Sequence, residues 1–211
     1  MRYRLAPKLI AAFLICFLAF TAASVHATSM KHRNIVELIS LSELILVGKV
    51  TSVTDGIEGG VPYTEITIIV SESVRGNIGS VYTFRQFGLL APRDMGNGRT
   101  YVGLSPDGWP RFATGEKVML FLYTKSDMTG LRTTVGLLQG KFTERRGRFV
   151  NGIDNQALFR NVSAAQGILN PAEEKLLKMR EGSVAAETLV SFVRKAVQKR
   201  LVEDGKLEHV K

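Results

Sequence analysis

The residues of this 211-residue sequence that could do acid–base or nucleophilic chemistry are few and scattered. Asp94, Asp107 and Asp127 fall in segments that we expect to be loops, where carboxylates could act as acid and base or bind calcium. Carboxylates in such positions are more often solvated turn formers. Ser105 lacks the glycine spacing of a nucleophile elbow, and no histidine is near it in sequence. We therefore predict a protein that is not an enzyme and that holds no metal or cofactor.

Cysteine and histidine are too rare for the sites that depend on them. Cys16 is the only cysteine, and the three histidines are His26, His32 and His209. Cys16 and His26 lie in an N-terminal segment that we expect to be removed. The mature chain would then lack most of the residues needed for a zinc site, a Cys/His dyad or a Ser-His-Asp triad. It would also have no disulfide, so burial must stabilise its fold.

Residues 1–27 have the three parts of a secretory signal peptide. Basic residues come first, an apolar run follows at residues 9–20, and the small residues around Ala27 are typical of a cleavage site. The apolar run is shorter than the roughly 20 residues that span a bilayer. We therefore expect an exported protein, periplasmic or extracellular, that is cleaved after Ala27 and then has no transmembrane segment. A retained N-terminal anchor is the alternative.

A long loop at residues 88–109 is the first candidate for a binding surface. Loops above about 12–15 residues in compact domains are usually functional or disordered, and the apolar residues of this one argue against disorder. It ends in the only tryptophan, close to an arginine, and these residue types dominate interface energies. We predict a site for a protein partner formed by Tyr101, Trp109, Arg111 and Phe112. In the alternative, Trp109 and Phe112 only plug the open end of a barrel.

A basic hairpin is the second candidate, and its four cationic residues are Lys141, Arg145, Arg146 and Arg148. With Tyr82 and Phe84 on a predicted strand, these residues could bind a nucleic acid single strand or another polyanion. Export removes the protein from most nucleic acid. The net charge also falls from +9 to +6 on cleavage, because residues 1–27 carry three basic residues and no acidic one. Nucleic acid is therefore the less favoured partner, and a hairpin that simply faces water is favoured.

The elements that position these candidates are organised around residues 118–123. All six residues are apolar, so both faces of a strand at this position would be buried. Residues 44–47 have the same property and begin a strand that should run to residue 53. Further strands are expected at 63–74, 80–87 and 131–139, with a hairpin at 141–151.

Helices are predicted from caps and from a change of period. Asn34 should cap a short helix, and Glu37 should complete its capping box. Near the C-terminus, Asn170 and Ser183 should cap two more helices. The second should place an apolar face, which includes Leu189 and Phe192, against the outward side of the strand at residues 118–123.

Five strands, of which the first and fourth are apolar on both faces, indicate an OB-like barrel, because those two strands are neighbours in that fold. We therefore expect a mainly β protein. Residues 28–160 should form a five-stranded barrel with a short N-terminal helix. Residues 161–211 should form an extension whose two helices pack on the outside of the barrel.

The order of several motifs resembles the netrin-like module, which is found in tissue inhibitors of metalloproteinases and in netrins. The motifs are Leu44-Ile45-Leu46-Val47-Gly48-Lys49-Val50, Tyr63-Thr64, Val74-Arg75-Gly76 and Gly115-Glu116-Lys117-Val118-Met119-Leu120-Phe121-Leu122. Bacterial exported proteins of unknown function show a similar pattern, which ends in a motif like residues 136–142. The resemblance implies an OB-type barrel over residues 44–142. The N-terminal cysteine with which the inhibitors chelate zinc is absent, so none of their inhibitory residues carries over.

The sequence thus predicts an exported binding module, without enzymatic activity, that recognises a protein or cell-envelope partner. Regulation of a secreted protease is a narrower form of this function, implied by the resemblance alone. An OB-type domain that binds an oligonucleotide or another polyanion is the alternative.

Overall fold

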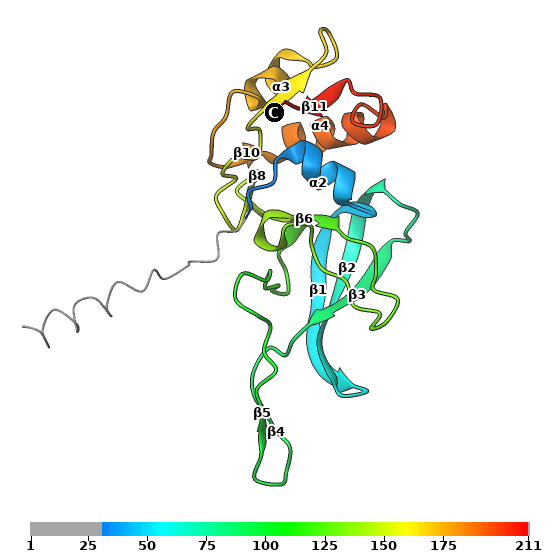
Figure 1. Cartoon of the computed structure of the whole chain (residues 1–211), viewed down its shortest axis with the longest axis vertical. Coiled ribbons are helices and arrows are strands. Elements are labelled where there is room, and N and C mark those ends of the chain that lie inside the picture. Colours follow the sequence, from blue (N-terminus) through cyan, green and yellow to red (C-terminus); the bar gives the residue numbers. More distant parts are fainter. Residues whose placement is uncertain (1–30, 211) are drawn as a thin grey trace, which may run out of the picture. The chain divides into compact units, whose positions relative to one another are not determined.

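The computed structural model describes residues 31–210, and the predicted signal peptide and its cleavage site lie outside the described residues (Figure 1). The elements, in chain order, are α2 (Ile35–Leu41), β1 (Leu44–Glu58), β2 (Val61–Arg75), β3 (Val81–Phe87), β4 (Arg93–Asp94), β5 (Thr100–Tyr101), β6 (Lys117–Leu122), the 3-10 helix η1 (Leu137–Gln139), β7 (Lys141–Arg145), β8 (Arg148–Asn151), β9 (Val162–Ala164), α3 (Pro171–Leu176), β10 (Val184–Ala185), α4 (Ala186–Gln198) and β11 (Leu207–His209). Among the described residues the fold is therefore mainly β, with three α-helices, as predicted.

A large antiparallel sheet has the strand order β10-β8-β7-β6-β1-β2-β3. β1 pairs with β6 from Leu44 opposite Leu122 to Lys49 opposite Lys117, so the predicted neighbours do lie side by side. The hairpin of β1 and β2 is longer than predicted. Its strands run up to a turn at Gly59 and Gly60, whose φ values of 57° and 80° favour glycine.

Both faces of β1 and β6 are buried, as the apolar runs predict. On one face Leu46, Val118 and Leu120 belong to a hydrophobic cluster with residues of β2 and β3. On the other face Met119 and Phe121 belong to a second and larger cluster. Successive strand residues point to opposite faces, so a fully apolar strand needs a cover on each side.

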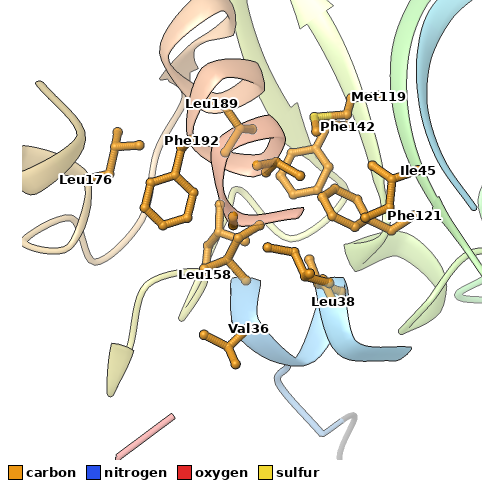
Figure 2. Close-up of a cluster of buried hydrophobic side chains, with 14 of the residues drawn as sticks. Val36, Leu38, Ile45, Met119, Phe121, Phe142, Leu158, Leu176, Leu189 and Phe192 are labelled. Atoms are coloured by element: carbon orange, nitrogen blue, oxygen red, sulfur yellow. The ribbon is translucent and has the colours of Figure 1, made fainter. Parts of the chain in front are cut away.

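Helix α4 supplies the cover for the second face. Its residues Leu189 and Phe192 belong to the cluster of Met119 and Phe121, as predicted, and Figure 2 shows these side chains gathered with Phe142. The same cluster contains Ile35 of α2 and Leu207 of β11. Residues from near both ends of the described chain therefore share one core.

The predicted strand at residues 131–139 is wrong. Thr134 forms one isolated bridge with Leu122, and residues 137–139 form the 3-10 helix η1. Gly136 and Leu137 have φ values of 65° and 58°, which a strand cannot contain. Without this strand, β3 remains an edge of the large sheet, and no closed barrel is found in the described part of the chain.

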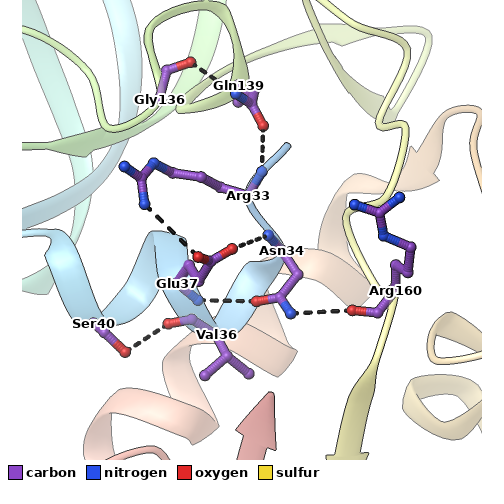
Figure 3. A network of polar contacts seen from close by, with 8 residues as sticks. All are labelled: Arg33, Asn34, Val36, Glu37, Ser40, Gly136, Gln139 and Arg160. Atoms are coloured by element: carbon purple, nitrogen blue, oxygen red, sulfur yellow. Dashed lines mark hydrogen bonds and ion pairs between the residues drawn. The ribbon is translucent and has the colours of Figure 1, made fainter. Parts of the chain in front are cut away.

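Two of the three predicted helix caps are confirmed and the third is wrong. Asn34 caps α2, and Asn170 caps α3, each in a capping box completed by a glutamate three residues later. Figure 3 shows the first box, with Asn34 and Glu37 bonded to each other and Arg33 beside them. Ser183 does not cap α4, because the next two residues pair with β8 as strand β10 and the helix begins only at Ala186.

The Arg75-Gly76 turn ties the sheet to α2. Arg75 Nη1 donates hydrogen bonds to the carbonyl oxygens of Ile39 (2.6 Å) and Ser42 (3.2 Å) at the C-terminal end of that helix. Gly76 has a φ of 90°, and a Cβ atom there would lie 2.1 Å from Cδ2 of Leu44. This motif of the resemblance thus has a structural role at this position.

Candidate functional site

The long loop between β3 and β6 is fixed at its base. The Asp55 carboxylate accepts hydrogen bonds from the Leu90 backbone N–H (2.8 Å) and from Arg93 Nη2 (2.5 Å). Leu89 is buried and bridges Leu104. Beyond this base, β4 and β5 pair as a short ribbon, which Figure 1 shows at the far end of the loop. Hydrogen bonds and strand pairing therefore give the loop a defined structure.

Four apolar side chains of the loop are exposed to solvent. The exposed fractions are 47% for Leu90, 50% for Met95, 70% for Val102 and 39% for Leu104. These four residues, which we call the loop surface, make up almost half of the large hydrophobic residues that are exposed in the described chain. Isolated exposed apolar residues are ordinary, but these four fall on one short segment of the chain.

The four residues predicted to bind a protein partner lie in different environments. Phe112 is buried and packs edge-on against Phe84, with 5.8 Å between the ring centroids. Trp109 is half-buried against Phe87 (6.3 Å between centroids). The half-buried Tyr101 donates a long hydrogen bond of 3.4 Å to the Gly60 carbonyl, and Arg111 is exposed. Tyr101 and Trp109 are therefore half-buried residues of the loop itself, while Phe112 belongs to the core.

The four cations of the basic hairpin are not equivalent either. The Lys141 side chain is only 10% exposed; its Nζ lies 2.7 Å from Glu116 Oε1 and donates a hydrogen bond of 2.5 Å to the Arg111 carbonyl. Burial lowers the pKa of Lys141, and its bond to Glu116 opposes that shift. Arg148 donates to Ser183 Oγ (2.8 Å). Of these four cations, only Arg145 and Arg146 form neither an ion pair nor a side-chain hydrogen bond within residues 31–210.

One cavity joins residues that the sequence assigned to two separate sites. Its volume is about 310 Å³, and Arg111 borders it together with Lys141 and Arg145; the other lining residues are Pro110, Leu138, Thr143, Val150, Asn151, Gly152 and Asp154. Sequence reasoning missed this arrangement. The alternation of Lys141, Thr143 and Arg145 along one strand was the available signal, because such residues share a face.

The aromatic pair proposed for stacking bases is mostly covered. The Tyr82 ring stacks on Phe84 at 6.1 Å, and Phe84 is buried. The Tyr82 hydroxyl accepts a hydrogen bond of 2.9 Å from Arg132 Nη1. Burial raises the pKa of Tyr82, since it disfavours the charged phenolate. These rings therefore expose little surface, although both line a cavity of about 310 Å³ beside Arg85, Lys125 and Arg132.

Of the remaining chemical groups, the two histidines of the described chain meet at one small cavity. His32 and His209 both line a cavity of about 130 Å³ beside Arg160. No group of three or more histidine, cysteine, aspartate or glutamate residues that could hold a metal ion occurs within residues 31–210. Asp94 accepts a hydrogen bond from the Gly96 backbone N–H (2.9 Å), in the manner of a turn former.

Comparisons with known proteins add no assignment to this geometry. None of the helices in the described range, residues 31–210, has the length and apolar character needed to cross a membrane. No family model, no curated protein and no solved structure matches the chain.

Proposed function

We propose that the chain is an exported, non-enzymatic binding module that recognises a protein or cell-envelope partner through the loop at residues 88–109. The observation that carries the proposal is a contrast within this loop. Asp55 and the buried Leu89 hold its base, while the loop surface exposes four apolar side chains. Ordering a segment costs conformational entropy, so an ordered loop that leaves apolar residues in water is suited to bury them against a partner.

Trp109 supports the same assignment. Its ring packs on Phe87 at the end of β3 and is half-buried, which leaves part of it open to a partner. A tryptophan that is partly immobilised before binding loses less side-chain entropy on binding. Trp109→Ala should therefore weaken the complex by about 2 kcal/mol or more, as expected of a hot spot.

The finer description of the fold is also a proposal: β1, β2, β3, β6 and the hairpin of β7 and β8 form an OB-like barrel of the netrin-like kind. It is supported by the adjacency of β1 and β6. Two hydrogen bonds of segment 131–133 add support, from the Arg132 N–H to the Arg85 carbonyl (2.8 Å) and from the Tyr123 N–H to the Thr133 carbonyl (3.0 Å). They join that segment to both β3 and β6, as barrel closure requires.

The polyanion alternative gains no comparable support. Glu116 already neutralises Lys141, and Arg148 is bonded to Ser183. Phe84 is only 6% exposed, so it offers little ring surface to a base. The hairpin itself keeps only two arginines that form no ion pair or side-chain hydrogen bond, which is a small charge for a ligand bound through counterion release.

The test of the proposed function uses the mature chain and an envelope fraction from the producing cell. A captured partner is purified, and its affinity is measured for the wild type, for Val102→Ser and for Met128→Ser. Met128 is the matched control, because it is 95% exposed and lies outside the loop. We expect Val102→Ser to weaken binding, Met128→Ser to leave it unchanged, and salt to have little effect. Binding that is indifferent to Val102→Ser and falls steeply with salt would contradict the proposal.

A further inference from the structure

The cavity beside Arg111 is built on one face of the hairpin of β7 and β8. Lys141, Thr143 and Arg145 alternate along β7, and Val150 of β8 stands opposite Thr143. The intervening residues of β7 and β8 include Phe142 and Phe149, which are buried in the core. Because successive residues of a strand point to opposite faces, the polar residues of β7 face the cavity, and Phe142 and Phe149 anchor the hairpin in the core.

The rim of the cavity is also held firmly. Gln86 Nε2 donates a hydrogen bond of 2.9 Å to the Pro110 carbonyl, and Lys141 Nζ donates one of 2.5 Å to the Arg111 carbonyl. Phe112, the next residue, is buried beneath the Lys141 ammonium, which lies 4.6 Å from its ring centroid. The backbone that carries the Arg111 guanidinium is therefore fixed before any ligand binds, which lowers the entropy cost of binding.

The charges around the cavity leave a small excess of positive charge. Arg111, Lys141 and Arg145 contribute three cations, while Asp154 and the Glu116 that binds Lys141 contribute two anions. Within residues 31–210, neither Arg111 nor Arg145 forms an ion pair. The site thus offers two unpaired guanidinium groups and a net charge of one, which suits a single negative charge better than a dianion or a polyanion.

We propose that this cavity binds a monocarboxylate that carries a short apolar group. A planar guanidinium matches a carboxylate through two parallel hydrogen bonds. Pro110, Leu138 and Val150 supply an apolar wall for the rest of the ligand. A volume of about 310 Å³ lies at the lower end of the range of about 300–1,000 Å³ that is typical of small-molecule sites, so the ligand is small. Either a free small acid or the C-terminal residue of a peptide presents this chemistry. This site does not depend on the loop surface.

The experiment titrates the isotope-labelled mature chain with N-acetylalanine and follows the backbone amides by NMR. N-acetylalaninamide is the neutral control probe, and inorganic phosphate is the control anion. We expect N-acetylalanine to shift the amides of Thr143 and Val150 in a saturable way, and the two controls to leave them in place. Arg111→Gln and Arg145→Gln should each weaken binding about tenfold, the value of one charged hydrogen-bonded pair. Arg146→Gln is the matched variant, since Arg146 is exposed at the tip of the same hairpin but lines no part of the cavity, and it should leave the affinity unchanged.

A second arm separates the two sources of the carboxylate. A short peptide that ends in alanine is compared with the same peptide as a C-terminal amide. Tighter binding of the acid peptide than of N-acetylalanine assigns the site to a peptide terminus, and equal or weaker binding assigns it to a free acid. The proposal is overturned if N-acetylalanine gives no saturable shift, if its amide or phosphate binds as well, or if Arg146→Gln costs as much affinity as Arg145→Gln.

Discussion

The cover that α4 provides for β6 can be tested through Phe192, which is buried in the cluster of Met119 and Phe121. Replacing a buried phenylalanine with alanine removes the transfer free energy of the ring and leaves a cavity, which together cost about 3–5 kcal/mol. The ring also meets Phe159 edge-on, with 5.8 Å between centroids. Such a pair adds about 0.5–1.5 kcal/mol beyond burial, so the loss should fall in the upper part of the range.

The assay is urea unfolding followed by far-ultraviolet circular dichroism. Phe192→Leu keeps most of the volume and should cost less than about 1.5 kcal/mol. Gln198→Ala, at an exposed position at the end of the same helix, should change stability by less than about 0.5 kcal/mol. A loss below about 1 kcal/mol for Phe192→Ala, at an unchanged slope with urea, would refute the covering role of α4.

Four further predictions follow from other contacts. Asp55→Ala should speed amide hydrogen exchange at residues 88–104 while global stability changes little, because it frees only the loop base. Gly76→Ala should lower the unfolding free energy by more than about 1 kcal/mol, through its positive φ and the clash with Leu44, as urea unfolding can show. Burial raises the pKa of Glu173, but hydrogen bonds from Lys195 and the Asn170 backbone outweigh it and leave that pKa below its ordinary value of 4.5. The native state thus favours the ionised carboxylate, which contributes to the unfolding free energy above pH 4.5. This contribution is lost as the pH falls through the lowered pKa. In Glu173→Gln, the unfolding free energy should therefore depend less on pH in the acidic range. If the proposed signal peptide is cleaved, mass spectrometry of protein collected outside the cytoplasm should find Thr28 as its first residue.

The features that the sequence predicted well depend on local pattern. The caps at Asn34 and Asn170 need only residues three positions away. The burial of both faces of β6 needs only the period of a strand and six apolar residues in a row. The adjacency of β1 and β6 was predicted from the two apolar strands together with the OB fold, in which the first and fourth strands are neighbours.

The features that the sequence missed depend on contacts between distant residues or on single backbone angles. The segment at residues 131–139 is rich in threonine, valine and leucine, yet two left-handed residues at Gly136 and Leu137 divide it. Ser183 is a suitable cap, but pairing of the next residues with β8 displaced the helix start. Arg111 and Arg145 lie far apart in the chain, and only the packing of the loop end on β7 brings them to one cavity.

The core shared by α2 and β11 has a consequence for how the chain folds. Ile35 and Leu207 lie near opposite ends of the chain but belong to one hydrophobic cluster. A chain made or exported with its N-terminus first can form the hairpin of β1 and β2 early, because those contacts are local. The face of β6 that carries Met119 and Phe121 is not fully covered until α4 and β11 have been synthesised. During that interval Met119 and Phe121 have only part of their native cluster around them, so we expect chaperones that hold unfolded chains to bind this segment and to release it once the last residues arrive.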